Sequence, residues 1–82
     1  MSAKEMFEKL GYELVFENKE VLRYRKKHLD VEFWKVYELV TGEKRKKFIK
    51  VSTVYDKPYL ISLDLLQAIN KQIEELGWKW NT

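Results

Sequence analysis

Residues 21–40, VLRYRKKHLDVEFWKVYELV, alternate apolar or aromatic residues with charged ones over most of their length. Successive side chains of a β-strand point to opposite faces of a sheet, so this alternation is typical of half-buried strands. We place two strands here, at 21–27 and 31–40, with a turn around His28 and Leu29. Residues 21–40 thus predict an antiparallel pair of strands at the centre of the chain.

Similar patterns, rich in Val, Tyr, Phe and Ile, lie on both sides of this central pair. They predict strands at 12–17 and 45–54, which turn-forming residues at 18–20 and 41–43 separate from the central pair. Four strands joined by short connections favour an antiparallel meander, in which each strand pairs with the next one along the chain.

Helices are predicted at both ends of the chain. Ser2 and Glu5 form a capping box that begins a short helix, and Gly11 is placed to end it in a left-handed conformation. Ser62 is the predicted N-cap of a longer helix, which Gly77 ends in the same way. The apolar stripe of this helix consists of Leu65, Leu66, Ile69, Ile73 and Leu76.

These elements predict the α+β class, as a single two-layer domain over residues 1–82. A four-stranded antiparallel meander is expected to carry the N- and C-terminal helices packed on one face, in the order α-β-β-β-β-α. Alternation puts Phe16 on that covered face and Val15 on the open one. The predicted cross-strand pairs of the open face are Glu13 with Arg25, Arg25 with Glu32, Val36 with Phe48, and Glu38 with Lys46, while Arg23 and Lys50 flank Trp34.

Residue types that carry catalysis are scarce in this chain. Cysteine is absent and His28 is the only histidine, which excludes cysteine nucleophiles and metal sites built from several Cys and His ligands. The three glycines are isolated, so no phosphate-binding loop is expected. Nearly every Glu has a Lys or Arg within cross-strand or helical reach, which is typical of a solvated surface. We therefore expect no enzyme activity, no cofactor and no metal.

Nothing in the sequence resembles a membrane-spanning segment. No apolar run approaches the roughly 18 residues that a spanning helix needs. The absence of cysteine fits a reducing compartment. We expect a cytoplasmic protein with no membrane partner.

Aromatic and apolar residues on the predicted open face are candidates for a contact surface. Tryptophan is enriched among the residues that dominate protein interfaces. The predicted protein-binding residues are Trp34, Val36, Phe48 and Trp80. They favour a non-enzymatic protein that binds another protein, and self-association into a homo-oligomer is left open.

Positive charge concentrates in the middle of the chain. The net charge is +3, but residues 21–54 carry ten Lys or Arg against four Asp or Glu. Such a region favours an alternative function, nucleic-acid binding, in which cations contact phosphates. The residues of this alternative are Arg23, Arg25, Lys27, Lys44, Arg45, Lys46, Lys47 and Lys50.

The two ends of the chain resemble small uncharacterised proteins of Gram-positive bacteria and their prophages. The resemblance rests on residues 66–78, LQAINKQIEELGW, and on residues 5–12, EMFEKLGY, which together make about a quarter of the chain. These are helix and helix-ending residues, so the resemblance implies a shared fold and no particular site. It further implies a phage-associated accessory role, in which the protein binds a component of the host or phage machinery.

Overall fold

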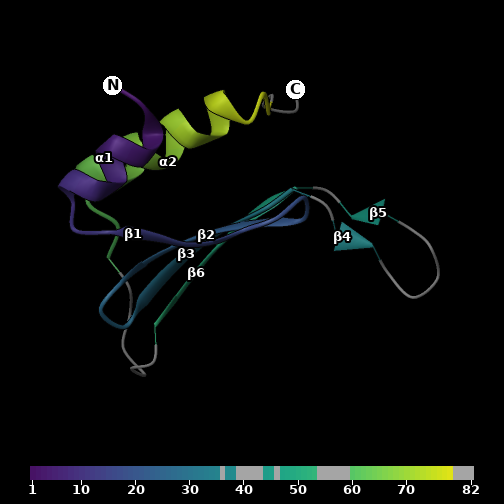
Figure 1. Ribbon diagram of the computed structural model, residues 1–82, viewed down its shortest axis with the longest axis horizontal. Coiled ribbons are helices and arrows are strands. Elements are labelled where there is room, and N and C mark those ends of the chain that lie inside the picture. The colour runs from purple at the N-terminus through teal and green to yellow at the C-terminus, as the bar shows by residue number, and fades with distance from the viewer. Residues whose placement is uncertain (36, 39–43, 46, 54–59, 79–82) are drawn as a thin grey trace. The chain divides into compact units, whose positions relative to one another are not determined.

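The computed structural model describes residues 1–35, 37–38, 44–45, 47–53 and 60–78, and gives the backbone alone for 37–38 and 44–45 (Figure 1). The chain divides into two compact units. One consists of Met1–Tyr12 together with Leu60–Thr82, and the other of Glu13–Tyr59. The first unit holds the two helices and the second holds the strands, while the single domain over residues 1–82 stays a prediction.

The helical unit consists of α1 (Ala3–Lys9) and α2 (Leu63–Glu75), which begin at the predicted caps. The Ser2 hydroxyl accepts a hydrogen bond from the Glu5 backbone N–H (3.2 Å), and the Glu5 carboxylate accepts one from the Ser2 backbone N–H (3.2 Å). This reciprocal capping box satisfies two backbone donors that a helix leaves without partners. The hydrogen bond from the Ser2 backbone is the main reason that the pKa of Glu5 lies below its ordinary value.

Both helices end at a glycine in the left-handed region, as predicted. Gly11 has φ 91° and Gly77 has φ 74°, values that cost little only in the absence of a Cβ. After α1 the Tyr12 N–H donates to the Phe7 carbonyl (2.9 Å), which is the long hydrogen bond of a Schellman ending. The rings of Phe7 and Tyr12 meet edge to face with centroids 5.7 Å apart, so the turn is also closed by an apolar contact.

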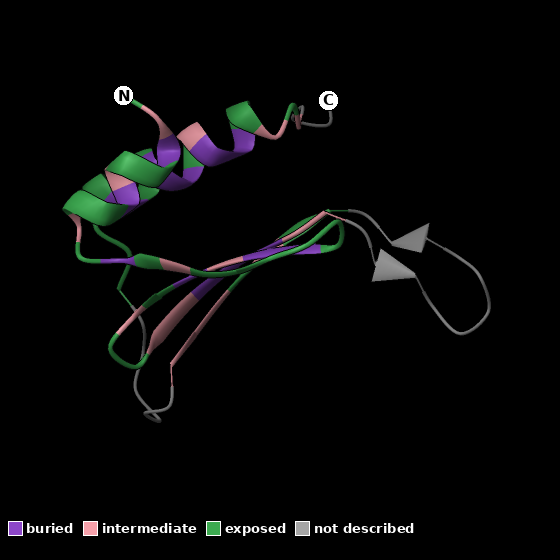
Figure 2. Ribbon diagram, in the orientation of Figure 1, coloured by how far each residue is buried: buried purple, intermediate pink, exposed green. Residues whose placement is uncertain are grey.

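The core of the helical unit lies between the facing sides of α1 and α2. The Ala3 backbone N–H donates to the Glu75 carboxylate (2.7 Å), which joins the start of α1 to the end of α2. The buried apolar residues of this unit are Ala3, Phe7, Tyr12, Leu65, Ala68, Ile69 and Ile73 (Figure 2). Leu66 was predicted to belong to this stripe but is 42% exposed, because adjacent residues of a helix point about 100° apart and Leu65 takes the buried direction.

The strand unit contains a four-stranded sheet in the order β1-β2-β3-β6, with every neighbouring pair antiparallel. Its strands are β1 (Glu13–Glu17), β2 (Val21–Lys26), β3 (Leu29–Trp34) and β6 (Phe48–Thr53). This order confirms the predicted antiparallel meander and, with a helix at each end of the chain, the α+β class. The β1–β2 turn falls where expected, and the Asn18 side chain accepts hydrogen bonds there from the backbone N–H groups of Glu20 and Val21, both at 2.8 Å.

The two longest predicted strands are each interrupted. A separate two-stranded ladder, β4 (Tyr37–Glu38) with β5 (Lys44–Arg45), lies in the chain between β3 and β6. Just after β3, the Lys35 backbone N–H donates to the Glu20 carbonyl (2.7 Å), and the Lys35 ammonium donates to the Asn18 carbonyl (3.1 Å). These contacts hold Lys35 against the β1–β2 turn, one residue beyond the end of β3, and the predicted strand 31–40 is divided between β3 and β4.

The register differs from the prediction by two residues in β2–β3. Glu13 lies opposite Arg25 as predicted, but Arg25 faces Asp30, and Glu32 faces Arg23. The cause is a tight turn, because Lys27 adopts the left-handed conformation (φ 53°) and lets Lys26 pair directly with Leu29. A shift of two preserves which face each side chain occupies, since the side-chain period of a strand is two.

A shift of the same size separates the predicted and observed register after β3. Phe48 pairs with Trp34 and not with Val36, and Glu38 pairs with Lys44 and not with Lys46. Val36 and Lys46 themselves lie outside the described residues. The faces are again preserved, and the shift brings two aromatic residues directly opposite each other.

A β-bulge in β1 overturns the prediction for Phe16. The pairing of β1 with β2 shifts between Leu14 and Phe16, so that Phe16 lies opposite Arg23. A bulge adds one residue to one strand, and every later side chain of that strand changes face. The Arg23 guanidinium lies over the Phe16 ring, 5.7 Å from its centroid, which confirms that the two share a face.

The two faces of the sheet have different chemistry. We call the face with Leu22, Tyr24, Val31 and Phe33 the apolar face; all four of these residues are buried (Figure 2). Tyr24 and Phe33 meet edge to face on it, with centroids 6.3 Å apart. We call the opposite one the charged face, because it carries Arg23, Arg25, Asp30, Glu32 and Lys50.

Candidate functional site

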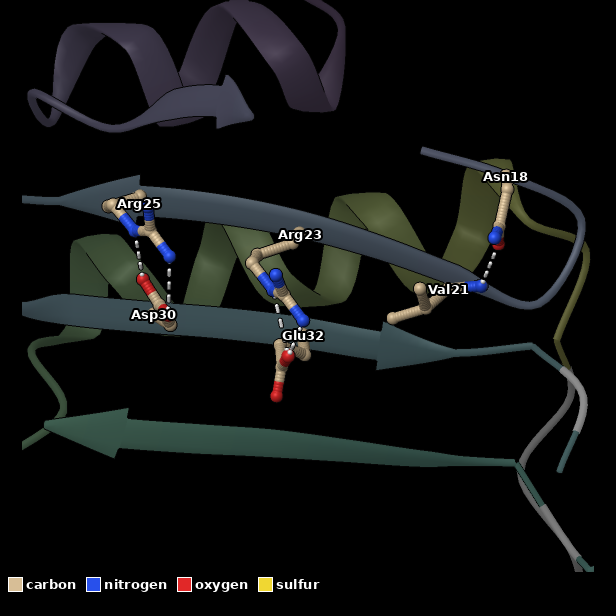
Figure 3. Close-up of polar contacts among 6 residues, drawn as sticks. All are labelled: Asn18, Val21, Arg23, Arg25, Asp30 and Glu32. Carbon is tan, nitrogen blue, oxygen red and sulfur yellow. Dashed lines mark hydrogen bonds and ion pairs between the residues drawn. The ribbon is translucent and has the colours of Figure 1, made fainter. Parts of the chain in front are cut away.

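The charged face is organised by two ion pairs between β2 and β3. Arg23 contacts the Glu32 carboxylate at 2.7 Å, and Glu32 is only 6% exposed (Figure 3). Arg25 donates two hydrogen bonds to the Asp30 carboxylate, at 2.8 and 3.2 Å, in the bidentate geometry that arginine favours. The hydrogen bond from Arg25 holds the pKa of Asp30 below its ordinary value. Both arginines of β2 are therefore neutralised within the sheet.

Trp34 and Phe48 form a stacked pair at one end of this face. Their ring centroids are 5.7 Å apart and their planes differ by 14°. Trp34 lies opposite Val21 on β2, which is buried, and opposite Phe48 on β6, which is 38% exposed. Residue burial thus falls from the middle of the sheet toward β6, and the Phe48 ring presents an accessible apolar surface at that side.

The structure brings together two of the four predicted protein-binding residues. Trp34 and Phe48 lie side by side, while Val36 and Trp80 lie outside the described residues. Phe16, which was not among the predicted binding residues, is 45% exposed on the same charged face, with the Arg23 guanidinium over its ring. Strict alternation could not reveal it, since only the bulge turns Phe16 toward this side.

The predicted nucleic-acid-binding residues are more widely separated than the aromatic pair of Trp34 and Phe48. Lys27 is exposed in the β2–β3 turn, and Lys47 is exposed immediately before β6. These residues flank opposite ends of β3 and β6, which pair over six residues and so span about 17 Å. Lys50 is exposed on the charged face between them.

The other members of that set add no described side chain to a basic surface. Arg23 and Arg25 are engaged with carboxylates. Lys44 and Arg45 are placed as backbone in β5, and Lys46 lies outside the described residues.

A second apolar surface, which we call the aliphatic cluster, surrounds the start of α2. Leu63 is 77% exposed, and Leu60 and Ile61 are also exposed in the segment before the N-cap. Leu66, one turn later, completes the cluster. Leu66 was predicted in the buried stripe of this helix but is not part of it, and the sequence signal for an exposed apolar surface here is Leu63, an apolar residue outside that stripe.

Neither a cluster of metal-ligand residues nor a membrane-spanning helix occurs in the described ranges. No three His, Cys, Asp or Glu side chains gather there closely enough to hold a metal ion. Of the described helices, neither has the length and hydropathy of a membrane span.

Comparison with known proteins finds no match for this chain among family models, curated proteins or solved structures. The resemblance to small proteins of Gram-positive bacteria and their prophages therefore stays a prediction, based on residues 5–12 and 66–78.

Proposed function

We propose that this protein is a non-enzymatic binding module that recognises another protein through the charged face of its sheet. The observation that carries the proposal is the stacked pair of Trp34 and Phe48, of which Phe48 presents accessible aromatic surface on the edge strand β6. Aromatic side chains dominate the binding energy of many protein interfaces. Val36 and Trp80 lie outside the described residues and stay predicted protein-binding residues.

The pair is suited to binding because it is already ordered. Each ring is held by stacking on the other, and both belong to paired strands. A side chain that is immobilised before binding loses less conformational entropy when the partner arrives. The ion pairs of Arg23 and Arg25 would form the polar rim around this apolar contact.

The biological role that we attach to this module is that of a phage-associated accessory protein in the cytoplasm. This role rests on the predicted resemblance of residues 5–12 and 66–78 to small proteins of Gram-positive bacteria and their prophages. Its expected target is a protein of the host or phage machinery.

The test is capture of a partner from nuclease-treated lysate of the native host, with tagged protein and the variant Phe48→Ala. Phe48 is partly exposed, so the variant should fold, and loss of one defined partner is the expected result. The matched control is Leu63→Ala, which truncates an exposed residue of the aliphatic cluster and should leave capture unchanged.

The opposite outcome would overturn the proposal for this face. If Leu63→Ala abolished capture and Phe48→Ala did not, the aliphatic cluster would be the contact surface. Circular dichroism of both variants would establish that each retains its fold.

Nucleic-acid binding is a second candidate because Lys47 and Lys50 are exposed beside the aromatic pair. An aromatic ring can stack on a base while nearby lysines contact phosphates. Phosphate contacts release counterions, so the affinity for a single-stranded oligonucleotide should fall steeply with salt. An affinity that does not change between low and high salt would exclude this mode of binding.

A further inference from the structure

The two edges of the sheet are unequal. β1 forms one edge and carries the bulge, which disrupts the regular spacing of backbone donors and acceptors. β6 forms the other edge and pairs with β3 over six consecutive residues without a bulge. Among the described strands, none pairs with the outer side of β6. A regular edge with which no described strand pairs is the kind to which an extended segment can add as a further strand.

Charge alternates across the sheet toward that edge. Arg23 on β2 faces Glu32 on β3, and Glu32 faces Lys50 on β6. Lys50 is exposed and ends this row, while Glu32 is already bound by Arg23 at 2.7 Å. Opposite charges on directly facing strand positions attract, so the position beyond Lys50 would favour an acidic residue.

The neighbouring row places an aromatic ring on β6. Trp34 faces Phe48, which lies two residues before Lys50 on the same face of β6 and is partly exposed. The position beyond Phe48 would favour an aromatic residue, because aromatic side chains pair well across strands. Between these two, Ile49 points to the apolar face and is half-buried, so the facing position would favour a small apolar residue.

We propose that the edge of β6 binds an extended segment of the partner protein, antiparallel to β6, with an acidic residue two positions before an aromatic one. This inference rests on the proposed protein-binding function and specifies how the partner is held. The acidic residue lies opposite Lys50 and the aromatic residue opposite Phe48. Backbone hydrogen bonds to β6 supply affinity, and these two side-chain contacts supply specificity.

The first test measures binding of a fluorescein-labelled peptide, TTEVFTT with blocked ends, by fluorescence anisotropy. Lys50→Glu should weaken binding of this peptide about three- to tenfold, because a cross-strand attraction becomes a repulsion. The peptide TTKVFTT should show the reverse preference and bind Lys50→Glu better than the unchanged protein. Equal affinities in all four combinations would overturn the role of Lys50.

The second test examines the backbone. In an added edge strand, alternate N–H groups point toward the sheet and the others point to solvent. Two peptides are therefore compared, each with every second residue of TTEVFTT N-methylated. Methylation of the N–H groups that point toward β6 should abolish binding, and methylation of those that point to solvent should leave it nearly unchanged. Equal effects of the two methylation patterns would overturn strand addition. Equal binding of the reversed peptide TTFVETT would overturn the antiparallel direction.

A second copy of the chain is the competing occupant. Light scattering that shows a concentration-dependent dimer, which excess peptide does not dissociate, would overturn the proposal in favour of self-association. Failure of the inference is distinguishable from failure of the proposed function. If Phe48→Ala abolishes partner capture but no peptide binds, the face binds its partner by another mode; if capture is unchanged as well, the proposed function is also wrong.

Discussion

The same four strands form the apolar face and the charged face of the sheet, yet the two faces are stabilised differently. On the apolar face, Val31 and Phe33 are fully buried and contribute through the area removed from water. On the charged face, ion pairs occupy the middle and an accessible Phe48 lies at the side. The difference shows which side chains this sheet needs for folding and which ones it can offer to a partner.

The largest expected effect separates two phenylalanines on neighbouring strands. Phe33→Ala should lower the free energy of unfolding by about 3–5 kcal/mol, because the removed ring is fully buried and leaves a cavity. Phe48→Ala should lower it by less than about 1 kcal/mol, since that ring is partly exposed. Urea unfolding followed by circular dichroism measures both. Similar losses in the two variants would break the distinction between the faces.

An intermediate effect is expected from the ion pair on the charged face. Arg23→Met should cost about 1–3 kcal/mol, because it leaves the buried Glu32 carboxylate without its guanidinium partner. The control is Arg25→Met on the same strand, whose partner Asp30 is more exposed and whose loss should cost less. Adding Glu32→Gln to Arg23→Met should recover part of the loss, and a double variant no more stable than Arg23→Met would contradict this account.

A smaller effect, of opposite sign, is expected at the turn that sets the register of β2 and β3. Lys27 has φ 53°, a conformation that costs most residues energy and that asparagine tolerates better. Lys27→Asn should raise the free energy of unfolding by about 0.5 kcal/mol. Within the described residues, no non-glycine residue other than Lys27 has positive φ, so His28→Asn is the control and should bring no gain.

The smallest effect concerns acid stability. The hydrogen bond from Arg25 lowers the pKa of Asp30 in the folded protein, so this carboxylate stabilises the fold above its unfolded pKa of about 3.9. That contribution is lost as pH falls through the lower, folded value. Asp30→Asn should therefore be less stable than the unchanged protein at neutral pH and lose less stability on acidification below about pH 4. Urea midpoints across a pH series measure it, and parallel profiles would contradict the prediction.

Local chemistry made the helical unit predictable in detail. The capping box of Ser2 and Glu5, the N-cap Ser62 and the left-handed glycines Gly11 and Gly77 all act over a few residues, and the structure places each as expected. The exception is Leu66, which was predicted to belong to the buried stripe of α2 but is exposed.

The candidate site was predictable only in part. Alternation correctly placed Trp34 and Phe48 on one face, because parity alone decides the face of a strand residue. It did not predict that they stack, nor that Phe16 joins them, since these facts depend on register and on a bulge.

The sequence by itself therefore determined the element types, the helix ends and the parity of β2, β3 and β6. The tertiary structure decided the pairing. A shift of two residues leaves every face unchanged, so the alternating pattern cannot distinguish Arg25 opposite Glu32 from Arg25 opposite Asp30. The left-handed turn at Lys27 selects between them, because it lets Lys26 pair with Leu29 and thereby fixes which residues of β2 and β3 lie opposite each other.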